Sequence, residues 1–302
     1  MQQPAIISFG RYKKQLLTSL PFFRRATHNE VNRLLEHDAN DSKLRCDAIR
    51  YRMEQTLAAA RPEYTEALRE FFSIILREQD EYEKERYQRL KSIADNPKAD
   101  RIIYNDPQKG TELLVDCISD NCYEYALHDY YESRLMKLSG SSVFKQMELF
   151  SVPQQEQDRF FDFLSPGFMR EWPLYQDKNL TWLMRYDAAN YTVNGIRDNI
   201  FYDAACFGLQ CSQVSFVPGQ YTAKPGYTLF YCTLGITVRN NEQDLDYHFY
   251  RYHPRFGLWS HKPGITPVTC FDNAGQLIQD PSRCVPDYDQ TVPVGFFEIN
   301  IT

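Results

Sequence analysis

A cysteine near the start of a predicted helix is the first residue in this sequence that could do chemistry. Asp120 or Asn121 can cap a helix that runs to about Leu138, which places Cys122 in the first turn. Unpaired backbone amides and the helix dipole favour negative charge there, and the thiolate is the nucleophilic form of cysteine. The sequence therefore predicts a nucleophile at Cys122 that still needs a base.

The base would have to be one of six histidines, of which His248 and His261 have a spacing that can be tested on a sheet. Side chains alternate along a strand, so Asp246 and His248 share one face of the strand predicted over 245–252. If residue 252 pairs with residue 257, His248 lies opposite His261 and the imidazoles are neighbours. A shift by one residue moves His261 to the other face. Spacing alone does not decide between these registers.

Metal, nucleotide and serine-hydrolase chemistry are disfavoured by motif spacing. Cys117, Cys122 and His128 lack the C-x2-C spacing of structural zinc sites, and so do Cys206 and Cys211. The sequence has no glycine-rich phosphate loop and no G-x-S-x-G motif. We predict no metal and no cofactor.

Composition indicates a globular protein. The 302 residues are 43% hydrophobic and 15% aromatic, enough for one large domain or two ordinary ones. With 34 basic and 40 acidic side chains the net charge is −6, which argues against nucleic-acid binding. The longest near-apolar run, residues 227–238, is too short to span a bilayer, so no transmembrane segment is expected. Eight cysteines without a recognisable signal peptide predict reduced thiols and a cytoplasmic location.

Glycine and proline divide the chain into a helical front and a β-rich back. Only Gly10 falls in the first 100 residues, whereas both residue types are frequent after residue 200. Helices predicted over 42–60 and from 62 to about 95 form a helical hairpin. Their apolar stripes pack on each other or allow self-association. Strands are predicted in an antiparallel meander over 228–239, 245–252, 258–261 and 266–271.

Several motifs resemble a little-characterised family of bacterial and large-virus proteins. They are N-C-Y-E-Y-A at 121–126, D-Y-H-F-Y-R at 246–251 and G-L-W-S-H-K-P-G at 257–264. The family is similar to NlpC-type papain-like cysteine hydrolases, in which a helix-borne cysteine faces a strand-borne histidine. The resemblance implies Cys122 as the nucleophile, with His248 and His261 as base and orienting group in either order.

The helical front of the chain and the resemblance of its later part together predict an α+β fold with two parts. A helical N-terminal region, 1–100, precedes a papain-like domain, 101–302, which has a C-terminal antiparallel β-meander and an insertion around 143–200. Asn121, Asp246 and Asp272 become supporting polar residues. The expected function is a cysteine hydrolase or acyltransferase, such as a thiol protease or amidase, that acts on an amide or thioester bond of a protein or peptide.

A second interpretation is a catalytically degenerate interaction or structural protein with the same fold, such as a viral or effector component delivered to a host cell or virion. Related sequences place a histidine at the head of the strand before D-Y-H, where this chain has Tyr231, Cys232 and Thr233. A second predicted helix, 199–206, would put Phe201 at the nucleophile position. Either feature would leave the fold without its catalytic machinery.

Without catalysis, the same residues have structural roles. Cys122 would be a small buried hydrophobe, and His248 and His261 would be satisfied histidines of a sheet. Trp259 would pack in the core, like the aromatic residues beside it. Lys262 would be an ordinary charge on a strand face.

Overall fold

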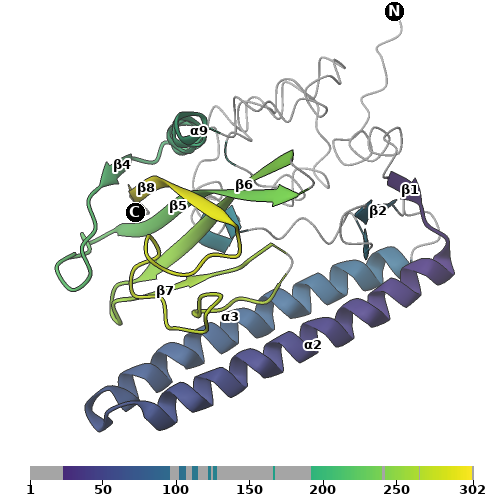
Figure 1. Ribbon diagram of the computed structural model, residues 1–302, viewed down its shortest axis with the longest axis horizontal. Coiled ribbons are helices and arrows are strands. Elements are labelled where there is room, and N and C mark those ends of the chain that lie inside the picture. Colours follow the sequence, from purple (N-terminus) through teal and green to yellow (C-terminus); the bar gives the residue numbers. More distant parts are fainter. Residues whose placement is uncertain are drawn as a thin grey trace, which may run out of the picture. The chain divides into compact units, whose positions relative to one another are not determined.

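The computed structural model describes residues 23–95, 102–106, 111–114, 122–123, 125–127, 166, 192–239, 242–264 and 266–300 (Figure 1). The chain forms two compact units. The first holds two long helices, a small sheet and the loop residues 264 and 266–268. The second holds the helical residues around Cys122, a further helix and a five-stranded sheet. The fold is α+β with helices at the N-terminal end and an antiparallel sheet, as predicted from the sequence.

Two helices dominate the first unit. Helix α2 spans His28–Ala59 and α3 spans Pro62–Asp95. α2 begins well before the predicted residue 42 because Thr27 and Glu30 form a capping box, in which each side chain accepts a hydrogen bond from the other residue's backbone N–H. Proline is tolerated at the first position of α3, where its missing N–H would have no helical partner. Among the described residues, no helix is long and apolar enough to cross a membrane.

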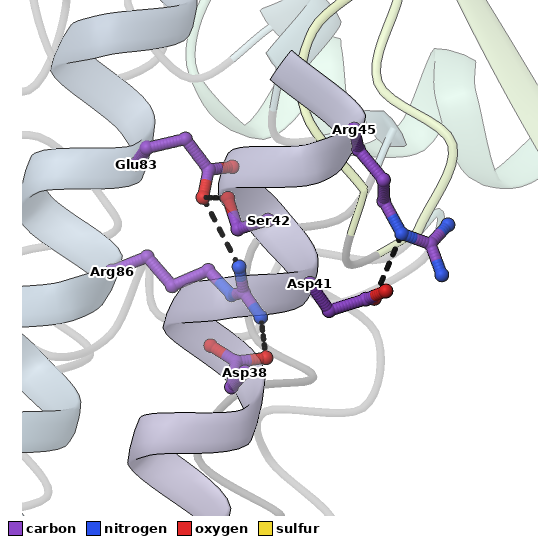
Figure 2. Close-up of polar contacts among 6 residues, drawn as sticks. All are labelled: Asp38, Asp41, Ser42, Arg45, Glu83 and Arg86. Carbon is purple, nitrogen blue, oxygen red and sulfur yellow. Dashed lines mark hydrogen bonds and ion pairs between the residues drawn. The ribbon is translucent and has the colours of Figure 1, made fainter. Parts of the chain in front are cut away.

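The helical hairpin combines an apolar end with a buried polar cluster. At one end Val31 and Leu35 of α2 pack against Leu90 and Ala94 of α3. Figure 2 shows the polar cluster further along, which we call the Arg86 cluster. It consists of Asp38 and Ser42 from α2 with Glu83 and Arg86 from α3.

Arg86 is the buried cation of that cluster. Its guanidinium forms ion pairs with Asp38 and, at 3.2 Å, with Glu83, while the Ser42 hydroxyl donates to Glu83. Burial raises the pKa of Asp38, and the guanidinium beside it opposes that shift. A buried charge is costly unless it is paired, so this cluster stabilises the pairing of α2 with α3 only while it is complete.

The small sheet of the first unit was not predicted from the sequence. Its strands are β1 (Phe23–Arg25), β2 (Ile102–Asp106) and β3 (Thr111–Leu114), antiparallel in the order β1-β2-β3. In the same unit, the side-chain N–H of Gln79 on α3 donates to the carbonyl oxygen of Val268 at 3.0 Å. The 264–268 loop is therefore tied to α3.

The five-stranded sheet of the second unit contains the predicted meander in part. The strands are β4 (Cys211–Val214), β5 (Tyr227–Arg239), β6 (Glu242–His253), β7 (Leu258–His261) and β8 (Gln290–Asn300), in the order β4-β8-β5-β6-β7. Consecutive strands β5, β6 and β7 pair as predicted. β8 was not predicted and pairs with both β4 and β5.

The predicted fourth strand, 266–271, is wrong. Thr269 and Phe271 form isolated bridges, to His261 and Leu277, in an otherwise irregular loop. Pro267 has no N–H to give to a ladder, which disfavours a regular strand there. The predicted helix from 122 to about 138 is described at 122–123 and 125–127, which are helical. Of the predicted insertion, 143–200, the described part is residue 166 and residues 192–200, where helix α9 (Val193–Cys206) begins after the Thr192 cap.

Register gives the sheet two distinct faces. The helix face carries Cys232, Phe249 and Phe297, and the rings of Tyr123 and Phe249 lie 4.9 Å apart on it. The opposite face, which we call the histidine face, carries His248, Tyr250, Tyr252, Trp259 and His261. An aromatic cluster packs on this face, formed by Phe216, Tyr221, Tyr231, Tyr250, Tyr252, Trp259 and Phe296.

Candidate active site

The two histidines of the signature are hydrogen-bonded to each other on the histidine face. His261 lies directly opposite Tyr250, so it is a diagonal neighbour of His248. The register differs by two residues from the one that would put the histidines opposite each other. Because the side-chain period is two, they still share a face. His248 Nε2 lies 2.6 Å from His261 Nδ1.

A backbone carbonyl determines where the protons of this pair lie. His261 Nε2 is 3.0 Å from the carbonyl oxygen of Phe271, which can only accept, so His261 Nε2 carries a hydrogen. In a neutral His261 the other nitrogen, Nδ1, is then an acceptor, and His248 must donate to it from Nε2. The lone pair of His248 is left on Nδ1, for which no described residue provides a hydrogen-bond partner.

Burial keeps both imidazoles neutral. It is the main reason that the pKa of His248 is lowered well below its usual value, and the neighbouring His261 lowers it further. Burial also lowers the pKa of His261, although the bond to Phe271 and nearby carboxylates oppose the shift. The His261 ring stacks on the Tyr250 ring, with centroids 4.9 Å apart, and the His248 ring is edge-on to it at 4.7 Å. A neutral imidazole with an open lone pair can accept a proton at neutral pH.

Asp272 acts on this pair through the loop that carries Phe271. Its carboxylate accepts hydrogen bonds from the backbone N–H groups of Gln276 and Val285, at 2.8 and 2.9 Å. Thr269 and His261 also exchange two backbone hydrogen bonds. These contacts hold the Phe271 carbonyl against His261. Asp272 thus has a supporting position, without a hydrogen bond to either imidazole.

Hydrogen bonds of β7 show which edge of β6 faces it. The N–H groups of Trp259 and His261 point away from β6, to carbonyl oxygens at 3.0 and 2.8 Å. Successive residues in a strand direct their backbone groups to opposite sides, so Ser260 is the residue that bonds to β6. Its partner is Arg251. The odd-numbered residues of β6, like Arg251, therefore point their backbone N–H and C=O groups toward the edge of β6 that pairs with β7.

The Cys122 thiol lies at this edge of β6, where β7 has ended. Pairing between the two strands stops at His261. Beyond it, Cys122 Sγ donates to the carbonyl oxygen of Tyr247 at 3.6 Å, and the N–H of Phe249 bonds to the sulfur. Tyr247 and Phe249 flank His248. The thiol is therefore bonded to the backbone on either side of the histidine, and it is hydrogen-bonded to that backbone rather than to an imidazole.

The thiol is protonated in this environment. Its residue is 4% exposed. Burial and the Asp246 carboxylate raise the pKa of Cys122, and the Phe249 N–H and the Lys262 ammonium only partly oppose them. This shift is opposite to the one expected from the helix dipole alone, because loss of solvation outweighs the dipole at a buried position.

Two residues around the thiol were not predicted to belong to the site. Tyr288 donates from its hydroxyl to Asp246 Oδ2 at 3.0 Å and to the Tyr247 carbonyl at 3.5 Å. Lys262 is fully buried, with 0% exposure, and is therefore not the ordinary strand-face charge of the non-catalytic interpretation. All four residues of β7, which directly precede Lys262, are buried as well. Trp259, predicted as a core residue, is 0% exposed.

The remaining candidates fall outside the site or outside the described residues. Phe201 is on α9, where its ring lies 5.7 Å from that of Phe297 on the helix face. Tyr231 packs in the aromatic cluster, 4.5 Å from the Phe296 ring. Asn121 and His128 lie outside the described residues. No group of three or more His, Cys, Asp or Glu side chains that could hold a metal ion occurs among those that are described.

Comparisons of the chain with models of protein families, with curated proteins and with solved structures found no match.

Proposed function

We propose that this protein is a cysteine hydrolase or acyltransferase with a papain-like domain, acting on an amide or thioester bond of a protein or peptide. The observation that carries the proposal is the hydrogen-bond chain from His248 through His261 to the Phe271 carbonyl, which leaves the lone pair of His248 on Nδ1. A helix-borne cysteine bonded to the backbone on both sides of that histidine supports it.

In the proposed reaction Cys122 is the nucleophile and His248 is the base. The sulfur turns from the Tyr247 carbonyl toward the imidazole, and its proton passes to His248 Nδ1 as the sulfur attacks the substrate carbonyl carbon. The imidazolium is stabilised by donation from its Nε2 to His261. The leaving amine or thiol takes that proton as its bond to the carbonyl carbon breaks, and the acyl group stays on the sulfur. Water or another acceptor then attacks this thioester and releases the acyl group.

The neutral thiol and neutral imidazole suit this order of events. A cysteine with a raised pKa does not react as a preformed thiolate, so proton transfer has to accompany attack. His248, with its lowered pKa, is available to accept the proton at neutral pH. His261 orients the base, and Asp272 holds the loop that orients His261.

The experiment is acetylation by p-nitrophenyl acetate, followed by mass mapping of the modified cysteine. We expect an acetyl group on Cys122, and its loss in Cys122→Ser. Cys284→Ser is the matched control, because Cys284 is half-buried and its thiol bonds to Tyr250 and Pro281. Acetylation that spreads over the other cysteines, or that leaves Cys122 unmodified, would contradict the proposal.

The alternative is an interaction or structural protein that retains this fold without catalysis. The burial of the Cys122 thiol and its hydrogen bond to the Tyr247 carbonyl favour it, because they are what a packing cysteine would have. The same experiment separates the two. An unreactive Cys122, together with a Cys122→Ser variant of lowered thermal stability, would support the alternative.

A further inference from the structure

Two hydrogen-bond donors converge on one carbonyl oxygen beside the proposed nucleophile. The Tyr247 oxygen accepts from Cys122 Sγ at 3.6 Å and from the Tyr288 hydroxyl at 3.5 Å. The thiol and the phenol are therefore both hydrogen-bonded to the same carbonyl oxygen. A substrate carbonyl under attack by the sulfur would need a donor near its oxygen, and the Tyr288 phenol is a side-chain donor that shares the Tyr247 carbonyl with the thiol.

The Tyr288 ring is held closely against β5. A Cβ atom added at Gly235 would lie 2.5 Å from the ring, so the ring packs directly on the glycine backbone. Gly235 is directly opposite Asp246, whose Oδ2 accepts from the Tyr288 hydroxyl at 3.0 Å. The ring centroid is 6.4 Å from that of His248. Ring packing and this hydrogen bond together hold the hydroxyl next to the thiol.

We propose that Tyr288 is the oxyanion donor of this site: its hydroxyl donates to the substrate carbonyl oxygen as Cys122 attacks. This inference rests on the function proposed above. As the sulfur bonds to the carbonyl carbon, the carbon–oxygen π pair moves to oxygen, and the phenol O–H turns from the Tyr247 carbonyl and Asp246 to that oxyanion. When the leaving group departs, the pair returns and the phenol hydrogen bonds to Asp246 again.

The environment keeps the phenol in its donating form. Burial raises the pKa of Tyr288, and the charge of Asp246 and the hydrogen bond to it raise it further. A protonated, preorganised donor costs no reorganisation when the charge develops, which is the basis of oxyanion stabilisation. Asp246 is on the exposed part of β6, so water can solvate its carboxylate while the phenol bonds to substrate.

The test compares two reactions of the same thiol in Tyr288→Phe. Acetylation by p-nitrophenyl acetate passes through an oxyanion, whereas alkylation by iodoacetamide does not. We expect acetylation of Cys122 to slow about 100-fold, as for loss of one oxyanion donor, while the alkylation rate stays within about twofold. Tyr227→Phe is the control, because it removes a hydroxyl that bonds to Gln210 at 3.3 Å, and both rates should be unchanged.

Each outcome bears on a different claim. If Tyr288→Phe is acetylated at the wild-type rate, Tyr288 is not the donor, although the proposed function stands. If both rates fall together, Tyr288 only maintains the structure and the inference is overturned. If wild-type Cys122 is not acetylated at all, the proposed function fails and this inference fails with it. If the phenylalanine variant does not fold, 3-fluorotyrosine in place of Tyr288 gives a stronger donor of similar shape; acetylation should then rise, and an unchanged rate would overturn the inference.

Discussion

His248 and His261 share a hydrogen bond of 2.6 Å although they are diagonal neighbours in the sheet. The direction of this bond is fixed, because the Phe271 carbonyl can only accept from His261, so His248 donates to His261. His248 is left with a lone pair on Nδ1 that accepts from none of the described residues, and His261 is the imidazole that orients it. The order of the two histidines, which the sequence leaves open, thus depends on a carbonyl in a loop.

Removal of the open lone pair should remove most of the reactivity of Cys122. We expect His248→Gln to slow acetylation of Cys122 by p-nitrophenyl acetate by about 100-fold or more, the range for loss of a general base. His37→Gln is the control, because His37 is exposed on α2. Equal acetylation rates in wild type and His248→Gln would show that His248 is not the base.

The rate of Cys122 acetylation at acid pH should reflect the lowered pKa of His248. A base with a pKa below its usual value stays neutral to lower pH, so acetylation of Cys122 should persist below about pH 6.5 and fall only further into the acid range. The measurement is the acetylation rate as a function of pH, corrected for the spontaneous hydrolysis of the ester. A half-maximal rate at or above the ordinary histidine pKa would contradict this environment for His248.

Stability should fall in acid through His253. Its ring bonds to the Ser260 hydroxyl at 2.6 Å, and burial, with a smaller effect of Arg251, lowers its pKa to about 3. The unfolded chain then binds a proton that the folded chain excludes, so this group destabilises the fold as the pH falls below about 6.5 and the loss levels off near pH 3. At about pH 5 the expected loss is about 2 kcal/mol relative to neutral pH.

Urea unfolding at the two pH values, followed by tryptophan fluorescence, measures this loss. In His253→Gln the difference between neutral pH and about pH 5 should shrink by that amount, whatever the variant's stability at neutral pH. The contribution of His253 is refuted if the variant and the wild type lose the same free energy of unfolding.

Because of the Arg86 cluster, Arg86 should contribute far more to the free energy of unfolding than the exposed Arg45 does. Arg86→Ala leaves Asp38 and Glu83 without their buried cation, and we expect the free energy of unfolding to drop by about 3 kcal/mol. Arg45→Ala removes an exposed pair with Asp41 and should cost less than about 0.5 kcal/mol. Denaturation followed by far-UV circular dichroism compares them, and similar losses would refute a stabilising role for the cluster.

Local patterns in the sequence predicted those parts of the fold that depend on neighbouring residues. Apolar periodicity and the Pro62 position predict the hairpin, and alternation with short turns predicts β5, β6 and β7. The start of α2 could have been found from the Thr27–Glu30 capping box. Strand β8 could not, because its pairing with β5 joins residues far apart in sequence.

The candidate site divides in the same way, into residues that local patterns predict and contacts that depend on the fold. Residue types and motifs single out Cys122, His248 and His261, but the diagonal contact of the histidines depends on the turn between β6 and β7. Tyr288 had no local motif. A glycine at 235, in a strand otherwise rich in large side chains, was the one available signal, since such a glycine often allows close approach of another group.

The burial of Lys262 had no counterpart in the sequence either. A lysine after a strand is ordinarily exposed, and its burial depends on how the surrounding segments pack. Its ammonium also favours the thiolate of Cys122, although burial of the sulfur has the larger effect. The effect of Lys262 on Cys122 therefore depends on the fold, because the two residues are far apart in the sequence.

The account depends most on where the lone pair of His248 lies. Nitrogen NMR of histidine-labelled protein at neutral pH, with His248 assigned by the signal lost in His248→Gln, measures it directly. The hydrogen-bond chain predicts a protonated Nε2 and an unprotonated Nδ1 for His248, and a protonated Nε2 for His261. A hydrogen on Nδ1 of His248, as imidazolium or as the other tautomer, would contradict its role as the base for Cys122.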